Sequence, residues 1–284
     1  MRRGLDRVFV FLAGACAAAV CALLLGIAGA IVWRGLAVLD WRFVTRLAAG
    51  SGGSGGVFYE ILGTLILVAA ALLVSAPLAT GVALTEAVYL DSRPRAGRWL
   101  LSALYAANSI PSVLLGIAGL IVFSRWLGWG KSWLAGGILL GLMILPTVSV
   151  ALIERLRSLP RKYVEAATGL GLSRSQVVRS VLLRQSLSGL VSGLLLGLAR
   201  AAGETAPILF AAAVFSGAGL PAGIRDSPVV ALPYHIFVLA QDSLDPAVQD
   251  HLWGAAAVLL GLVFALSLLA LPVRLRIHEE AKHA

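Results

Sequence analysis

Long apolar runs, separated by short polar stretches, fill most of this chain. Each of six runs is long enough to cross the roughly 30 Å hydrocarbon core of a bilayer as a helix of about 20 residues. The runs cover residues 8–32, 59–83, 99–123, 134–153, 187–215 and 253–271. The pattern therefore predicts an all-α integral membrane protein with six transmembrane helices.

The composition agrees with a lipid environment. Hydrophobic residues make up 59% of the 284 positions and charged residues 13%, and the mean hydropathy is +0.92; an ordinary soluble domain is less apolar. Cys16 and Cys21 both lie in the first run, at a spacing that matches neither a redox pair nor a zinc site. That run exceeds the roughly 7–15-residue core of a signal peptide, which predicts an uncleaved first transmembrane helix.

The chain is strongly basic, with a formal net charge of +9. In a soluble protein this balance would suggest nucleic-acid binding, but here the basic residues follow the loops between the apolar runs. Sixteen of them lie in the N-terminal segment, the 93–98 loop, the 155–184 segment and the tail, against six in the opposite loops. Because cytoplasmic loops carry the excess of Lys and Arg, both termini are predicted to lie in the cytoplasm.

Glycines form two patterns. In the fifth run, Gly189, Gly193 and Gly197 repeat every four residues. Such a stripe of small residues lets membrane helices approach closely, so the fifth helix is predicted to pack inside the protein. The Ser/Gly run at 51–56 is typical of a flexible extracytoplasmic linker, with a phosphate-cradling loop as the alternative.

The sequence predicts no catalytic, cofactor or metal site on this chain. Residues 130–132 read GKS, like the end of a P-loop, but Arg125 stands where the first glycine belongs and no strand precedes it. His235 has no partner ligands nearby in the sequence. If the protein uses ATP and Mg²⁺, another chain must bind them.

Residues 154–178, between the fourth and fifth runs, are too polar to span a membrane. Pro160 can open a helix in its first turn, and the glycines at 169 and 171 can end that helix. Ser173 is a capping candidate for a second amphipathic stretch. The pattern predicts a short helix, a glycine turn and another helix along the cytoplasmic face.

Within this stretch, Glu165-Ala166-Ala167 is followed after three residues by Gly171. The spacing, continued by Val181 and Leu183, resembles the EAA motif of ABC importer permeases. The family usually has proline where this chain has Arg184, and often another where it has Ser188. The resemblance implies a coupling helix at about 160–180 that docks into a groove of an ATPase subunit.

Two ionisable residues interrupt the fifth run, in the segment 199–207, which reads ARAAGETAP. The four-residue spacing places Arg200 and Glu204 on one face of a helix. They form either an internal ion pair that only fixes helix packing, or a site in which the planar guanidinium of Arg200 meets a tetrahedral oxyanion. Gly203 and Pro207 loosen the helix there, which favours a transport site.

The same string, with Leu209-Phe210 after it, closely resembles the signature of the PstA-type family of phosphate importer permeases. Pro111-Ser112 with Gly116, and Leu145-Pro146, add to a resemblance that covers roughly residues 61–271. It implies a type I ABC importer permease of a bacterial inner membrane, in which Arg200, Glu204 and Thr205 line the substrate pathway. It also implies a PstC-like sister permease, a PstB-like ATPase dimer that binds ATP and Mg²⁺, and a PstS-like phosphate-binding protein.

Three parts follow from these patterns. Residues 1–58 hold the first helix and the Gly/Ser-rich loop, 59–272 the permease core, and 273–284 a cytoplasmic tail. The acidic stretch at 216–251 lies outside, where it either docks the binding protein or forms a solvated cap, with a short interfacial helix at 233–237. The alternatives for function are a permease for another oxyanion, such as molybdate, sulfate or a phosphonate, and an ATP-independent channel or structural membrane subunit.

Overall fold

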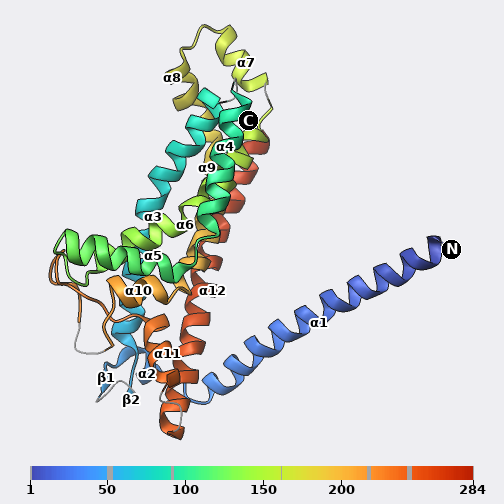
Figure 1. Cartoon of the computed structure of the whole chain (residues 1–284). Helices are drawn as coiled ribbons and strands as arrows, with labels where there is room; N and C mark the ends of the chain where they lie inside the picture. The colour runs from blue at the N-terminus through green and yellow to red at the C-terminus, as the bar shows by residue number, and fades with distance from the viewer. Residues whose placement is uncertain are drawn as a thin grey trace.

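The computed structural model describes residues 2–49, 54–90, 93–160, 162–215, 219–241 and 245–283, and the side chains of residues 2–8, 270 and 273–283 are outside the description. Within these ranges the chain is helical except for loops and one small hairpin (Figure 1). Part of the Ser/Gly run, Arg161, Asp242 and the side chains of the charged tail lie outside the described residues.

The predicted first span is the helix α1 (Arg2–Leu36), which diverges from the other helices (Figure 1). Its apolar window, in Phe9–Leu36, buries none of its residues against the rest of the chain. Within the described side chains of Phe9–Leu36, the helix packs at its end, where Arg34 lies 4.9 Å over the Trp253 ring of α12 (Pro246–His283). A helix that is apolar all round needs lipid or a partner helix to cover it.

After α1, a short helix α2 (Trp41–Thr45) leads to a hairpin of β1 (Ala48–Ala49) and β2 (Ser54–Gly55). The predicted flexible linker is wrong for residues 54–56, because a Cβ atom at Gly56 would overlap the carbonyl oxygen of Arg46. The absence of a side chain at Gly56 lets its backbone lie directly against that of Arg46.

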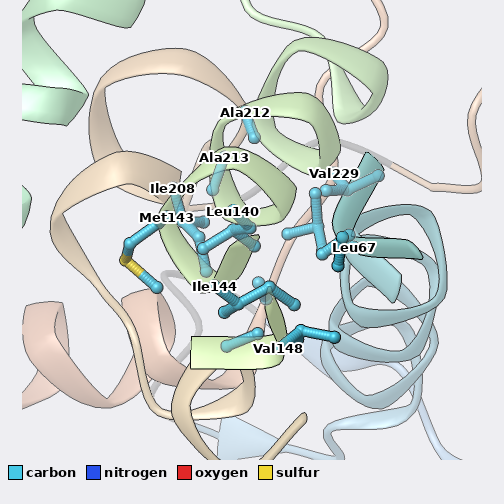
Figure 2. Close-up of a cluster of buried hydrophobic side chains, with 13 residues drawn as sticks. Leu67, Leu140, Met143, Ile144, Val148, Ile208, Ala212, Ala213 and Val229 are labelled. Atoms are coloured by element: carbon cyan, nitrogen blue, oxygen red, sulfur yellow. The ribbon is translucent and has the colours of Figure 1, made fainter. Parts of the chain in front are cut away.

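The core is built from α3 (Phe58–Thr85), α6 (Trp133–Arg157) and α9 (Leu183–Ala202). Figure 2 shows Leu140, Ile144 and Val148 of α6 in the cluster with Leu67 of α3. The glycine stripe of α9 faces α6, since a Cβ at Gly193 would lie 3.1 Å from the Val148 carbonyl oxygen. The predicted close packing of the fifth helix is confirmed.

The third predicted span, 99–123, is not one straight helix. It divides into α4 (Pro94–Asn108) and α5 (Ser112–Gly119), which continues as the π-helical η2 (Leu120–Trp126), with a bend of 87° between the two parts. Pro111 has no N–H to donate and disfavours helical geometry at the preceding residue, so the helix breaks before it. In Figure 1, α5 runs across the direction of α4.

The fifth predicted span, 187–215, also differs. A continuous helical stretch runs from α8 (Arg174–Val177) through η3 (Val178–Leu182) into α9, and it ends at Ala202. Gly203 is its C-cap residue, and a separate short helix, α10 (Ala206–Ala211), follows with a proline in its first turn. The predicted loosening at Gly203 and Pro207 is a complete break between two helices, so the single span to residue 215 is wrong.

Among the described residues, five helices are long and apolar enough to cross a membrane, and the bent pair makes six if it counts as one span. The second span is α3 with its π-helical extension η1 (Glu86–Leu90). The predicted short helix after residue 232 is confirmed as α11 (Leu232–Gln241), but it is not simply interfacial, because Pro233 and His235 are buried. These findings indicate a multi-pass membrane protein.

Candidate functional site

Arg200 lies in the last turn of α9, and Glu204 lies just beyond that helix. The N–H of Gly203 donates to the carbonyls of Arg200 and Ala201, which closes the helix. The two charged residues are therefore not on one helix face as predicted. Their side chains still meet, with Arg200 Nε 3.9 Å from Glu204 Oε1.

A second helix break brings a partner to Arg200. Asn108 is the last residue of α4, and its Oδ1 accepts a hydrogen bond from Nη1 of Arg200. The same oxygen accepts from the hydroxyl of Thr147 in α6, at 3.2 Å. Thr147 follows Pro146, a proline inside α6. The ends of α4 and α9 and the middle of α6, far apart in sequence, thus supply one polar cluster, defined here as Asn108, Thr147, Arg200 and Glu204.

This polar cluster is open enough to receive a ligand. The side chains of Arg200 and Glu204 are 30% and 20% exposed, and Asn108 is exposed. Among the described residues only Asn108 receives a hydrogen bond from the guanidinium, which has five donors. The remaining donors form a planar fork that suits two oxygens of a tetrahedral oxyanion.

Thr205 lies at the start of α10, where its carbonyl accepts from the N–H of Leu209 at 2.9 Å. Its side chain makes no capping hydrogen bond. Its sequence neighbour Glu204 belongs to the polar cluster, so Thr205 lies next to the cluster.

The predicted helix, turn and helix between the fourth and fifth apolar runs are confirmed. The first helix is α7 (Lys162–Gly169), and Gly171 has φ +78°, a conformation that L side chains rarely adopt. Ser173 and Gln176 form a capping box at the start of α8. In Figure 1, α7 and α8 lie together at the end of the molecule opposite α2 and α11.

The EAA residues divide between two environments. Glu165 and Ala166 are exposed, while Ala167 is buried. Ala167 belongs to a hydrophobic cluster that joins α7 and α8 to the ends of α3, α4 and α6. One side of α7 is therefore attached to the membrane helices and the other remains free.

Sequence reasoning missed several polar residues that the fold brings together. Asn108 carried a usable signal, since it is a polar residue three positions before a proline inside an apolar run. No sequence signal indicates that Glu86 pairs with Arg157, which lies 71 residues further along the chain. Glu60 was likewise overlooked inside an apolar run.

Glu60 belongs to a second buried group, formed with His235 of α11 and His251 of α12. His235 Nδ1 lies 3.8 Å from Glu60 Oε1, and the two imidazole rings are 5.5 Å apart. Both His235 ring nitrogens lack a hydrogen-bond partner in the described structure. Burial, assisted by the nearby His251, lowers the pKa of His235 to about 4, so its ring is neutral at pH 7.

Comparison with known proteins relates the chain as a whole to transport proteins. Residues 76–276 match the family described as binding-protein-dependent transport system inner membrane component. The chain is 32% identical over 287 residues to a probable phosphate transport system permease protein PstA of Methanocaldococcus jannaschii, covering 98% of this chain and 95% of that protein. It is 33% identical over 241 residues to phosphate transport system permease protein PstA 2 of Mycobacterium bovis, covering 84% and 77% respectively.

A solved structure shares the fold. An inward-facing structure of the MetNI methionine ABC transporter superposes with a TM-score of 0.59 at 17% identity, over 78% of this chain and 94% of that one. At this identity the likeness concerns architecture only, and it is that of a type I ABC importer permease. The family match over most of the chain, the relatives and the shared architecture agree: this chain belongs to the binding-protein-dependent transport system inner membrane components.

Proposed function

We propose that this chain is the membrane permease subunit of an ATP-driven importer that carries inorganic phosphate. The observation that carries the proposal is the partly exposed guanidinium of Arg200, held where α4 and α9 end, with Asn108 as its one hydrogen-bond acceptor among the described residues. Relatives covering most of the chain are named phosphate transport permeases. A tetrahedral phosphate with several charged oxygens is the kind of ligand that such a fork binds.

In this proposal Arg200 binds the anion, and Asn108 holds the guanidinium in place between substrates. Glu204 balances the arginine charge while the site is empty, and its long contact with Arg200 is easily replaced by a ligand. Thr205, next to Glu204, lines the same path.

Coupling to ATP is assigned to the segment from α7 to α8. Glu165 and Ala166 offer an exposed helix face, Ala167 anchors that face to the membrane helices, and Gly171 sets the turn. The helix docks on an ATPase dimer of the PstB type, which binds ATP and Mg²⁺, so this chain is not itself the enzyme. The coupling segment and both termini face the cytoplasm, in keeping with the positive charge there.

The remaining partners are a PstC-like sister permease and a PstS-like binding protein. The exposed apolar side chains of α1, among them Phe9, Phe11 and Leu25, need a hydrophobic cover of lipid or a sister subunit. The binding protein delivers the anion to the outer face, near α11.

The experiment is radiolabelled phosphate uptake by cells that lack their own high-affinity system and express this chain with its ATPase, sister permease and binding protein. Three variants are compared with wild type: Arg200→Gln, Arg200→Lys and Glu165→Arg. Arg98→Gln, an exposed arginine of α4, removes one charge elsewhere and serves as the control. Arg200→Gln is expected to lose at least tenfold of uptake while the complex assembles, and Glu165→Arg to lose assembly with the ATPase.

Each contrary result has a defined meaning. Normal uptake by Arg200→Gln would remove Arg200 from the path. Wild-type uptake of molybdate or sulfate in place of phosphate would keep the architecture and overturn the substrate. Uptake that persists without any ATPase would instead support a channel.

A further inference from the structure

We propose that Glu86 and Arg157 form a mechanical link that carries movement of the cytoplasmic coupling segment into α3 and α4. The inference rests on the proposed function, because it assigns a role within ATP-driven import. Both residues are positioning residues, since they lie away from the polar cluster around Arg200.

The pair connects three membrane helices at one point. Nε and Nη2 of Arg157, the last residue of α6, both donate to Oε1 of Glu86, the Nε contact being 3.1 Å. Glu86 is the first residue of η1, the π-helical extension of α3. The backbone of α4 lies alongside, since a Cβ at Gly97 would be 3.7 Å from the same carboxylate oxygen. The carboxylate is therefore enclosed between α3, α4 and α6.

The connection from this pair to α7 is short and hydrogen-bonded. Beyond Arg157, the N–H of Ser158 donates to the carbonyls of Glu154 and Arg155, and the N–H of Leu159 donates to that of Leu156. Helix α7 begins soon after, at Lys162. In α7, the N–H of Tyr163 donates to the carbonyl of Pro160 at 3.2 Å. A displacement of α7 therefore reaches the end of α6 through a short connection.

A hydrophobic cluster surrounds the same region and makes it one body. Its buried members come from α3, α4, α6, α7, α8 and η3. They are Ala83, Leu104, Leu152, Ile153, Leu156, Ala167, Val177 and Leu182. Apolar contacts resist separation but allow sliding, because they have no preferred direction. The charged hydrogen bonds of Glu86 add the direction that such a cluster lacks.

The exposed fractions of the two side chains also favour a link that transmits movement over a contact that only stabilises helix packing. The Glu86 side chain is 7% exposed while that of Arg157 is 52% exposed. A carboxylate that is buried when paired strongly resists loss of its partner. α3 and α4 are therefore bound to follow α6, and α4 leads directly to Asn108 at the polar cluster.

The test measures phosphate transported per ATP hydrolysed by the complete importer reconstituted in vesicles. The variants are Glu86→Gln, the doubly neutral Glu86→Gln/Arg157→Gln, and Arg157→Lys, which keeps the positive charge. Glu154→Gln and Arg98→Gln, both at exposed positions, are the charge-matched controls. For the double variant we expect full assembly, ATP hydrolysis within twofold of wild type and at least a fivefold fall in phosphate per ATP. Arg157→Lys should keep more than half of the wild-type ratio.

A ratio in the double variant within twofold of wild type would overturn the link, as would an equal fall in either control. A parallel loss of hydrolysis and uptake would also overturn it, because that is the behaviour of a merely structural contact. If the double variant does not assemble, Glu86→Gln decides by the same criterion, since Arg157 is then free to turn to solvent. Absence of phosphate uptake by wild type would instead count against the proposed function, and the ratio is then measured with the oxyanion that wild type carries.

Discussion

Two arginine–glutamate pairs in this chain differ in almost every physical respect. Arg200 and Glu204 are neighbours in sequence, partly exposed, and 3.9 Å apart at their closest atoms. Arg157 and Glu86 are 71 residues apart, and the carboxylate is nearly buried and directly hydrogen-bonded. A long, hydrated ion pair exchanges its partner for a ligand at little cost, whereas a buried one does not. The first pair is suited to binding a ligand, and the second is suited to holding two helices together.

The contact between His235 and Glu60 is a third case, in which the basic partner is charged only when it is protonated. Both side chains are almost fully buried, and the imidazole is neutral at pH 7 because burial lowers its pKa. Ordered by the size of the expected effect, four measurements separate these cases.

The largest effect is expected from low pH acting on His235. Its pKa falls from 6.5 to about 4 in the folded protein, so between these values the unfolded chain binds a proton that the folded chain does not. Stability from this group is complete above pH 6.5 and is lost as the pH falls towards 4, by about 3 kcal/mol. Thermal unfolding in detergent from pH 7 to 4 measures it. His235→Phe, which keeps a ring against Phe215, should show a shallower fall; an unchanged slope would contradict the prediction.

The next effect distinguishes the two arginines. Arg157→Ala leaves the buried carboxylate of Glu86 without its cation, and because Arg157 itself is half-exposed we expect a loss of about 2 kcal/mol. Arg200→Ala should lower stability by less than about 1 kcal/mol, since its pair is already exposed to solvent. The midpoints of thermal unfolding of the two variants give the comparison directly. Equal losses would mean that the pairs do not differ as described.

A smaller effect concerns the anchor of Arg200. Asn108→Ala removes the acceptor for the guanidinium, worth about 1 kcal/mol for one hydrogen bond, and should lower uptake at limiting phosphate roughly fivefold. Thr147→Val removes only the second donor to Asn108 and should change uptake less. Initial rates over a range of phosphate concentrations test both. A larger loss in Thr147→Val than in Asn108→Ala would show that Asn108 is not the anchor.

The smallest effect on stability is expected for Glu204→Gln. The contact with Arg200 is long and partly exposed, so the free energy of unfolding should change by less than about 1 kcal/mol. Raising the salt concentration should shift the unfolding midpoints of wild type and variant by the same amount. A clear loss of stability in the variant would mean that this pair holds the fold rather than serving the ligand.

Local signals predicted the structure of the polar segment from α7 to α8 well and the surroundings of Arg200 less well. Pro160, the glycines and the cap at Ser173 act within a few residues of themselves, and the observed helix–turn–helix follows them. The sequence predicted 99–123 as one span and did not predict the break at Pro111, because whether a helix bends at a proline depends on what neighbouring helices supply. The site roles of Arg200, Glu204, Thr205 and the EAA residues stay predictions for the experiments above.

The sequence by itself determined the membrane character, the number of apolar segments, the position of the polar helix, turn and helix between the fourth and fifth runs, and the presence of Arg200 beside Glu204. Each of these depends on composition, length or short spacing, which the lipid core and the helical period translate directly into structure. Only the tertiary structure decided that Asn108 and Thr147 meet Arg200, that Glu86 binds Arg157, and that Glu60 lies with His235. Those contacts join residues from separate helices, and helix packing, which depends on the whole set of side chains at once, brings them together.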